Sequence, residues 1–221
     1  METTLHQQLK RCYAGSEQNT EVVLGRYRID AIRDDELIEI QCASLSAISS
    51  KCQDLLKRHR LRVVKPVIAR TRIAKIARKG GKVNSRRMSP KRGNILDIFE
   101  DLIYFTRVFP DPNLTFEVPM VHVEQIRGPA KKRRWRQKKY KVYDVSLESI
   151  ERTYEFRSPA DLLDLIPWGD QPVSFDTADI AKAIGRPRWV AQQVAYVLKK
   201  VGAIEQLKRK RSGIIYQCKA A

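Results

Sequence analysis

The sequence is poor in the residues that build disulfide frameworks and metal–thiolate sites. Four cysteines are present among its 221 residues, namely Cys12, Cys42, Cys52 and Cys218, and no two of them form a Cys-x-x-Cys pair. This spacing argues against a structural zinc site and against a disulfide-stapled fold. Scattered thiols of this kind favour a reducing compartment, so we expect a cytoplasmic protein.

Long hydrophobic runs are also missing. No stretch approaches the roughly 18 apolar residues that a membrane span needs. The first residues, Met-Glu-Thr-Thr-Leu-His, lack the basic and apolar regions of a secretory signal. We therefore expect no membrane partner. Hydrophobic residues still make up 43% of the chain, which is enough for a packed core.

Acidic residues are scarce relative to basic ones, and the excess is clustered. The chain has 43 lysines and arginines against 25 aspartates and glutamates, a net charge of +18. Residues 57–93 hold fifteen cations and no acid, residues 125–143 hold nine and no acid, and residues 208–211 read Lys-Arg-Lys-Arg. One such run is typical of a solvated loop, but three in a folded chain indicate a polyanionic partner, most simply nucleic acid.

The first two basic blocks contain side chains suited to phosphate contact, because guanidinium and ammonium groups donate strongly to phosphate oxygens. The candidates are Arg86, Arg87, Lys91 and Arg92 in the first block, and Arg133, Arg134, Trp135 and Arg136 in the second. In the second block Trp135 and Tyr140 alternate with cations. Aromatic side chains among cations can stack on unpaired bases, so RNA binding is a candidate function, ranked behind two functions that involve DNA.

Hydrophobic periodicity predicts the order of the elements in the first 156 residues. The first seventy residues read helix, strand, strand, helix, strand, and a basic segment, a helix and a strand follow. The expected bounds are a helix at 3–13, strands at 20–33 and 36–42, a helix at 44–58, a strand at 61–69, a basic strand and ordered loop within 71–93, a helix at 95–105 and a strand at 114–126.

The last sixty residues change character. Ser158 and Asp176 or Thr177 are helix-capping residues, and a third helix runs from Arg186 to Gly202. Two short strands, 203–207 and 213–217, then flank a basic turn. This order resembles a winged helix-turn-helix domain, which implies that the third helix enters the major groove of DNA while the hairpin contacts the backbone. The implied contacts are Arg186, Arg188, Trp189, Gln192, Gln193 and Tyr196 on the helix, and Lys208, Arg209, Lys210 and Arg211 on the hairpin. Protein contact is the alternative use of such a domain.

Two carboxylates are predicted to meet on the hairpin of 20–33 and 36–42. With a turn at Arg33–Glu36, Asp30 lies opposite Glu39, on the face that also carries Arg28 and Gln41. Like charges placed opposite one another destabilise a sheet. A divalent cation is the usual reason to keep them, and Mg²⁺ prefers carboxylate oxygens. The alternative is an ordinary polar face on which Arg28 and Arg33 neutralise the two acids. The other face, with Ile29, Ala31, Ile38 and Ile40, is expected to meet the core.

A helix, a strand ending in Asp, a strand with Glu-x-Gln, a helix and a strand resemble the core of the PD-(D/E)XK nuclease superfamily. The resemblance covers residues 1–70. It implies that Asp30 and Glu39 bind Mg²⁺ or Mn²⁺, and that Gln41 stands where a water-orienting lysine usually lies. In some members that lysine comes from the following helix, where Lys51 is the candidate. An additional acid often comes from the first helix or nearby, and Glu2 and Glu21 are the candidates here.

The predicted fold is therefore α/β, with a restriction-endonuclease-like mixed sheet flanked by helices in residues 1–156 and a small winged-helix domain in 157–221. The predicted function is a metal-dependent DNA endonuclease that hydrolyses phosphodiester bonds while the winged helix anchors or selects the DNA. A homodimer would let two single sites cut both strands. The alternative is a catalytically inactive DNA-binding protein that keeps the nuclease fold.

Overall fold

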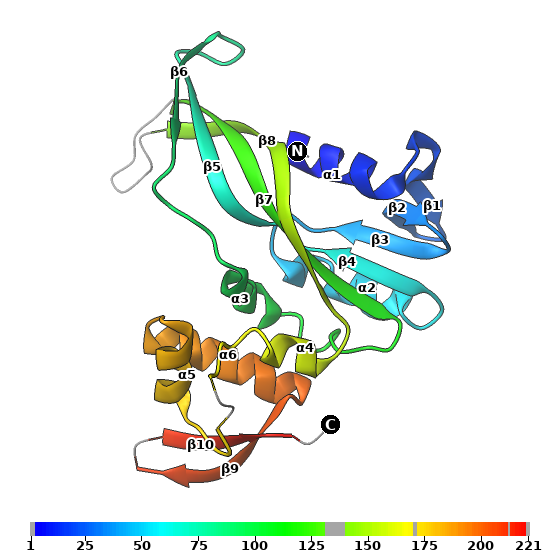
Figure 1. Cartoon of the computed structure of the whole chain (residues 1–221). Helices are drawn as coiled ribbons and strands as arrows, with labels where there is room; N and C mark the ends of the chain where they lie inside the picture. Colours follow the sequence, from blue (N-terminus) through cyan, green and yellow to red (C-terminus); the bar gives the residue numbers. More distant parts are fainter. Residues whose placement is uncertain (1–2, 131–139, 170–171, 212, 220–221) are drawn as a thin grey trace. The chain divides into compact units, whose positions relative to one another are not determined.

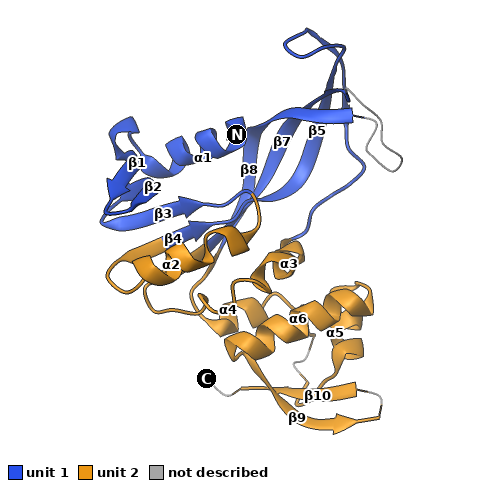
Figure 2. Ribbon diagram, turned by 180° about the vertical axis from the view of Figure 1, so that it is seen from behind, with its two compact units in different colours: residues 1–42, 62–94, 117–154 blue, residues 43–61, 95–116, 155–221 orange. Residues whose placement is uncertain are grey.

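A computed structural model describes residues 3–130, 140–169, 172–211 and 213–219. The chain divides into two compact units, each assembled from separate stretches of sequence (Figure 2). Unit 1 comprises residues 1–42, 62–94 and 117–154, and unit 2 comprises residues 43–61, 95–116 and 155–221. The boundary at 156/157 expected from the sequence stays a prediction.

The protein is an α/β protein with a mixed eight-stranded sheet plus helices, followed by a C-terminal helical region and a β-hairpin (Figure 1). The strands of the large sheet follow the order β1-β2-β3-β4-β7-β5-β6, and β8 pairs with β7. Their bounds are β1 Thr20–Leu24, β2 Tyr27–Arg33, β3 Glu36–Ile40, β4 Arg60–Val64, β5 Val67–Ile76, β6 Val83–Met88, β7 Leu114–Pro129 and β8 Tyr140–Phe156.

Strand directions make the sheet mixed. The pairs β1–β2, β2–β3 and β5–β6 are antiparallel, whereas β5 runs parallel to β7. Only Lys65 and Pro66 separate β4 from β5 in the sequence, yet β7 lies between these two strands. The centre of the sheet is therefore completed by a strand that comes about fifty residues later in the chain.

Helix α1 (Thr4–Ala14) packs on the sheet of unit 1. Its start is capped by Thr3, whose side chain accepts a hydrogen bond from the His6 amide, and it ends at Gly15, whose φ of 70° is left-handed. The helix and the sheet share one buried apolar cluster, which contains Leu5, Leu9, Ala14, Ala31, Ile38, Ile40, Val64, Val121 and Val123. This packing fixes the polar face of α1 beside β1 and β2.

Several elements differ from the bounds predicted by the sequence. The expected strand 20–33 is two antiparallel strands, because Gly25 adopts a φ of 57° and the chain reverses there. The basic segment after residue 70 extends β5 and forms β6, so most of it is a two-stranded hairpin.

The turn between β2 and β3 predicts a stabilising substitution. Arg33 pairs with Glu36, and the two residues between them, Asp34 and Asp35, have φ values of 50° and 61°. Such turns favour Asn-Gly, because left-handed backbone strains residues that carry a Cβ. The double variant Asp34→Asn, Asp35→Gly should therefore raise the free energy of unfolding by about 1 kcal/mol. Urea denaturation measures the change, and an unchanged midpoint would contradict it.

Unit 2 begins with short helices. These are the 3₁₀ helices η2 (Leu45–Ala47) and η3 (Ile95–Asp97), and the α-helices α2 (Ser49–Leu55) and α3 (Ile98–Leu102); the 3₁₀ helix η1 (Glu17–Asn19) belongs to unit 1. The predicted helices 44–58 and 95–105 thus each consist of a 3₁₀ turn followed by a short α-helix. Phe116 lies about 6 Å, ring centroid to centroid, from Phe105, Phe109 and Phe156 and forms the aromatic core of this unit.

The C-terminal region contains α4 (Pro159–Leu163), α5 (Thr177–Ile184), α6 (Arg188–Val201), β9 (Ile204–Lys210) and β10 (Gly213–Cys218). Capping boxes at Ser158 and Asp176 begin α4 and α5. Strands β9 and β10 form an antiparallel hairpin, and Phe175 makes a β-bridge to Tyr216. Within the described part of the chain, every helix is too short or too polar to cross a membrane.

Candidate active site

The register of β2 and β3 agrees with the predicted one. The pairs are Arg33–Glu36, Ile32–Leu37 and Ala31–Ile38, and Asp30 and Glu39 are the next residues along the two strands. The four apolar residues predicted to face the core, Ile29, Ala31, Ile38 and Ile40, are all buried. Glu39 is also buried, with 4% of its surface exposed, although the sequence placed it on the polar face.

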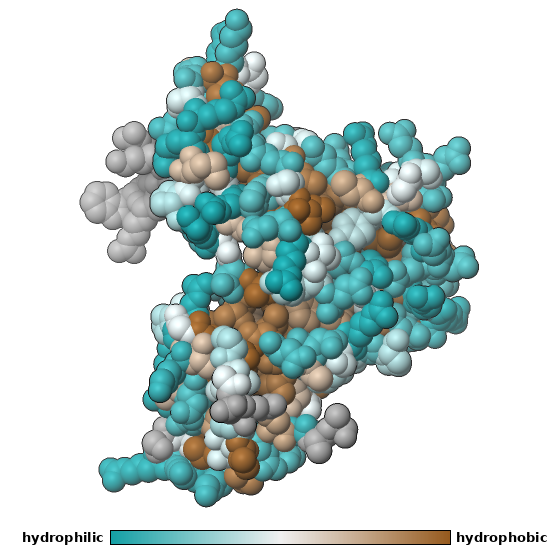
Figure 3. Space-filling view, in the orientation of Figure 1, coloured by the Kyte–Doolittle hydropathy of each residue, from teal (hydrophilic) through white to brown (hydrophobic). Residues whose placement is uncertain are grey.

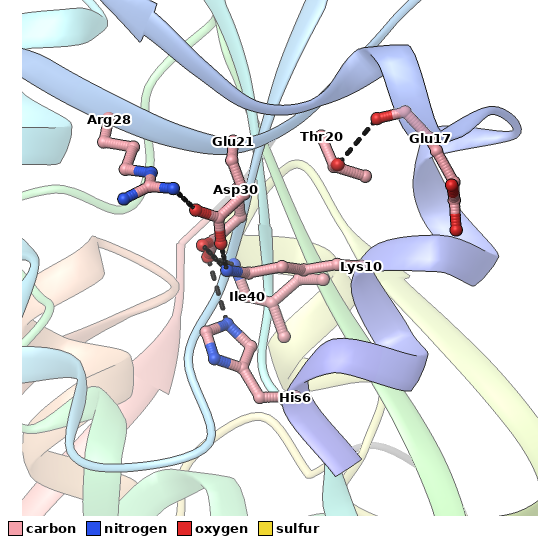
Figure 4. Close-up of polar contacts among 8 residues, drawn as sticks. All are labelled: His6, Lys10, Glu17, Thr20, Glu21, Arg28, Asp30 and Ile40. Atoms are coloured by element: carbon pink, nitrogen blue, oxygen red, sulfur yellow. Dashed lines mark hydrogen bonds and ion pairs between the residues drawn. The ribbon is translucent and has the colours of Figure 1, made fainter. Parts of the chain in front are cut away.

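Asp30 receives three hydrogen-bond donors. Its Oδ2 accepts from the Ile40 backbone N–H at 2.9 Å and lies 3.2 Å from His6 Nε2, and its Oδ1 lies 3.0 Å from Lys10 Nζ (Figure 4). Burial raises the pKa of Asp30, but the donors from His6, Ile40 and Lys10 more than offset burial and lower the pKa to about 2. The carboxylate is therefore ionised at neutral pH.

Lys10 places its ammonium between two acids. The side chain is 8% exposed, and Nζ contacts Glu21 Oε1 as well as Asp30 Oδ1. Glu21 also forms an ion pair with Arg28, and its pKa is lowered, first by the hydrogen bond from Lys10. Burying a lysine ammonium is costly unless opposite charges compensate it, and here the two carboxylates do so. The site therefore already binds one positive charge (Figure 4).

The alternative of an ordinary polar face did not include Lys10 among the cations that neutralise the acids. Arg28 contacts Glu21, and Arg33 Nε lies 3.5 Å from Asp34 Oδ2. The cation at Asp30 is instead Lys10, on α1. Sequence reasoning missed both Lys10 and His6. The available signal was their i, i+4 spacing, which puts both side chains on the same face of one helix.

Of the three remaining predicted site residues, the structure describes Gln41 and Lys51. Gln41 follows β3, is half-buried, and donates its backbone N–H to Val64 O at 2.8 Å. Lys51 is half-buried on α2, in unit 2, so its role stays a prediction. Glu2 lies outside the described residues. Among the residues that are described, no group of three or more His, Cys, Asp or Glu side chains is arranged to hold a metal.

The first basic block forms an exposed surface on the β5–β6 hairpin. Arg86, Arg87, Lys91 and Arg92 are all exposed, and Arg86 Nε lies 2.9 Å from Glu124 Oε1 on β7. Hydrophilic side chains dominate this hairpin in the face shown in Figure 3. The four candidate contacts of the second block lie outside the described residues, which include none of Arg133, Arg134, Trp135 and Arg136.

Helix α6 presents polar and aromatic side chains outward. Ala191, Val194, Val197 and Leu198 are buried, while Trp189 and Tyr196 are 55% and 45% exposed. Two polar residues of the helix, Arg188 and Gln192, are also exposed, whereas Gln193 is half-buried. Arg186, which precedes the helix, is exposed as well. Arg188 Nε donates to Thr177 Oγ1 at 3.1 Å, which ties the start of α6 to α5.

The β9–β10 hairpin ends in cations. Lys208, Arg209, Lys210 and Arg211 are exposed, as the sequence predicted for the basic turn. β9 extends as far as Lys210, so three of these residues lie on a strand and Arg211 follows it. Four exposed positive charges at one end of a hairpin form a surface suited to phosphate contact.

Comparisons with known proteins give a family without an assigned activity. Residues 3–157 match the family described as "Domain of unknown function (DUF8091)". An "Uncharacterized protein" of Treponema pallidum (strain Nichols) is 28% identical over 162 residues, which cover 73% of this chain and 64% of that protein. The chain thus spans less than two thirds of the length of this relative. No solved structure matches the chain.

Proposed function

The chain belongs to the DUF8091 family, a domain of unknown function, and from its own residues we propose that it is a metal-dependent DNA endonuclease. One observation carries the proposal. Asp30 lies on β2 and forms an ion pair with the nearly buried Lys10, and the buried Glu39 lies on the neighbouring strand β3. Such carboxylates are costly to keep unless a cation neutralises them.

The donor set suits a hard divalent cation. Mg²⁺ and Mn²⁺ prefer oxygen ligands, and Mg²⁺ is often held by one or two carboxylates together with waters and a substrate phosphate. Asp30 and Glu39 would hold it, and Glu21 is the additional acid at the site. When bound, the metal supplies a water of lowered pKa and offsets charge on the scissile phosphate.

The other side chains would position the water and the carboxylate. Gln41 has an amide, which can hydrogen-bond a water but can neither carry a charge nor act as a base. His6 and Lys10 hold the Asp30 carboxylate in position through its two oxygens. Some members of the PD-(D/E)XK superfamily take the water-orienting lysine from the helix after the second acid, and Lys51 is the candidate for that lysine.

The element order supports the resemblance to the PD-(D/E)XK nucleases. α1 is followed by β1, by β2 with Asp30, by β3 with Glu39, and then by α2 and β4. The strand order β1-β2-β3-β4 keeps these strands adjacent in the sheet. Gln41 departs from the lysine that usually stands at this position of the superfamily.

The C-terminal region supports DNA as the substrate. A helix, a bridged strand residue, two helices and a hairpin resemble a winged helix-turn-helix, with α6 as the groove-reading helix and β9–β10 as the wing. Arg188 and Gln192 could pair with base edges, and the cations at residues 208–211 could contact phosphates. Two copies of the chain would cut both strands, so a homodimer belongs to the proposal.

A specific observation favours the second candidate, a DNA-binding protein that does not cut. Lys10 already neutralises Asp30 and Glu21, so this site does not require a metal for its stability. In that case the protein would bind duplex DNA with an affinity that falls steeply with salt. RNA binding is the third candidate, and competition between duplex DNA and single-stranded RNA separates it from the other two.

Plasmid nicking tests the proposal. Supercoiled plasmid incubated with the protein and Mg²⁺ or Mn²⁺ should become nicked, and EDTA should prevent it. Glu39→Ala should lower the nicking rate at least about a hundredfold, because a metal-ion contribution of several kcal/mol is lost. Asp30→Ala should have a similar effect.

Glu151→Ala is the matched control, since Glu151 has a 58% exposed side chain and binds His122 rather than the site. This control should nick at the wild-type rate. A Glu39→Ala protein that cuts as fast as wild type would refute the site. A wild-type protein that shifts DNA in a salt-dependent manner without cutting it would establish the second candidate.

A further inference from the structure

Strands β6, β5, β7 and β8 of unit 1 lie side by side in the large sheet (Figure 1). Residues of these four strands line a basic pocket. Its volume is about 360 Å³, and it is lined by Ile73, Lys75, Ile76, Arg87, Arg127, Gly128, Pro129 and Tyr140. A cavity of this size takes a small molecule or one residue of a polymer, and a double helix is too wide for it.

Strand pairing brings the lining residues together. Ile73 on β5 pairs with Arg87 on β6, and Lys75 pairs with Arg127 on β7. A register shift between Lys75 and Ile76 interrupts the alternation of β5. The pocket therefore joins three cations from three neighbouring strands to buried aliphatic side chains.

An aromatic ring completes the wall. The Arg127 guanidinium carbon lies 4.2 Å from the centroid of the Tyr140 ring, and Arg127 Nε donates to Gln125 Oε1 at 2.6 Å. These two contacts fix the orientation of the guanidinium against the ring. Gly128 has no room for a side chain, because an added Cβ would lie 2.6 Å from the Tyr143 ring. The close approach of β7 and β8 that builds this wall therefore requires glycine.

The chemistry of the lining indicates the class of ligand. Among the described residues that line the pocket, none is acidic, and Lys75, Arg87 and Arg127 supply three positive charges. An anion such as phosphate uses these cations. The faces of Ile73, Ile76 and Tyr140 suit a flat, weakly polar ring, as in the stacking of a nucleobase on an aromatic side chain. A bare phosphate would leave the apolar wall unused.

We propose that this pocket binds one unpaired nucleotide, with its base against the wall of Ile73, Ile76 and Tyr140 and its phosphate against Lys75, Arg87 and Arg127. The inference rests on the proposed DNA binding and specifies which form of DNA the protein prefers. Bases inside a duplex are stacked and cannot enter a pocket, so the favoured substrate is DNA with a single-stranded overhang or an extruded base.

Binding to two matched probes tests the pocket. Fluorescence anisotropy in EDTA compares a labelled blunt duplex with the same duplex carrying a short single-stranded overhang. The wild-type protein should bind the overhang probe about tenfold more tightly, since stacking of one base is worth about 1–3 kcal/mol. Tyr140→Ala should bring the ratio of the two affinities close to one, and Tyr140→Phe should keep it.

Lys79→Gln is the control for charge alone. Lys79 is exposed, lies near the turn between β5 and β6, and does not line the pocket. The Lys79→Gln substitution should lower the affinity for both probes to the same extent and leave the ratio of the two affinities unchanged. The proposal that the pocket binds a nucleotide of a DNA strand would be overturned if the wild type bound both probes equally. It would also be overturned if Tyr140→Ala kept the wild-type preference for the overhang probe.

Free deoxyadenosine monophosphate distinguishes a strand from a small ligand. Displacement of the overhang probe only at millimolar concentration assigns the pocket to a nucleotide within a strand. Saturable, Tyr140-dependent binding of the free nucleotide at micromolar concentration, without an overhang preference, assigns it to a mononucleotide. No binding of either would refute the pocket. EDTA removes any cleavage from these measurements, so their failure is distinct from a failure of the nicking experiment.

Discussion

Replacing Glu117 with alanine is expected to lower the free energy of unfolding by about 3 kcal/mol, because it removes the central acid of a buried polar network. Glu117 is 6% exposed and accepts from Tyr13 Oη and Arg62 Nη1, and Arg62 Nε lies 2.8 Å from Glu36 Oε2. Without Glu117 the nearly buried Arg62 keeps only part of its compensation. Burial, and then the hydrogen bond to Glu117, raise the pKa of Tyr13, so the phenol stays protonated and acts as a donor.

A second glutamate on the same strand provides the control. Glu124 is also on β7, but its partner Arg86 is 55% exposed, and solvent-exposed ion pairs contribute about 0–1 kcal/mol. Urea denaturation of Glu124→Ala should therefore show a loss below about 1 kcal/mol. Equal losses in the two variants would contradict the central role of Glu117. Glu117→Gln should lose less than Glu117→Ala, since the amide can still accept from Tyr13.

Replacing Lys10 with methionine should destabilise the protein by about 3 kcal/mol in the presence of a chelator, because Asp30 and Glu21 lose the ammonium between them. Millimolar Mg²⁺ should then restore stability to the variant by more than it adds to the wild type. Thermal unfolding with Mg²⁺ and with EDTA measures both increments. The result tests the metal site without any measurement of cleavage.

The pH dependence of stability also distinguishes the wild type from Lys10→Met. The pKa of Asp30 is about 2 in the folded protein, below its ordinary value of 3.8, so its contribution to stability is complete above about pH 4 and is lost as the pH falls toward 2. The shift corresponds to about 2 kcal/mol. Without Lys10 the pKa of Asp30 should rise, and the loss should begin at a higher pH.

Two further variants control the Lys10 experiment. Lys10→Arg keeps the positive charge and should behave closer to wild type than Lys10→Met. The double variant Lys10→Met, Asp30→Asn removes a proposed metal ligand and should lose the extra Mg²⁺ increment. Equal Mg²⁺ increments in wild type and Lys10→Met would contradict the prediction that Mg²⁺ can neutralise the carboxylates that Lys10 neutralises in the wild type.

The hairpin with Asp30 and Glu39 was predictable because local rules determine it. Alternation of apolar and polar residues, together with one polar turn, sets the register of two strands. The split of the strand at Gly25 was missed, although glycine within a strand pattern often marks an irregularity. The helix-capping residues Ser158 and Asp176 likewise act within a few residues, and both begin helices in the structure.

The partners of Asp30 were not predictable from local pattern. Lys10 lies on a helix whose polar residues normally face solvent, and only the packing of Leu5 and Leu9 against the sheet turns its side chain toward β2. His6 reaches Asp30 for the same reason. The basic segment was predicted to hold one strand and an ordered loop, and its pairing as the β5–β6 hairpin was missed because cationic residues are poor markers of β-structure. Tertiary contacts between distant segments decided each of these cases.

The insertion of β7 between β4 and β5 has a consequence for the order in which the chain can fold during synthesis. The ribosome releases the hairpin with Asp30 and Glu39, and then β4 and β5, long before it releases residues 114–129. Until then β4 and β5 each expose an unpaired edge, with positive charges along β5. The candidate site should therefore mature late, and nascent chains that end before residue 114 should be protease-sensitive and need protection from aggregation.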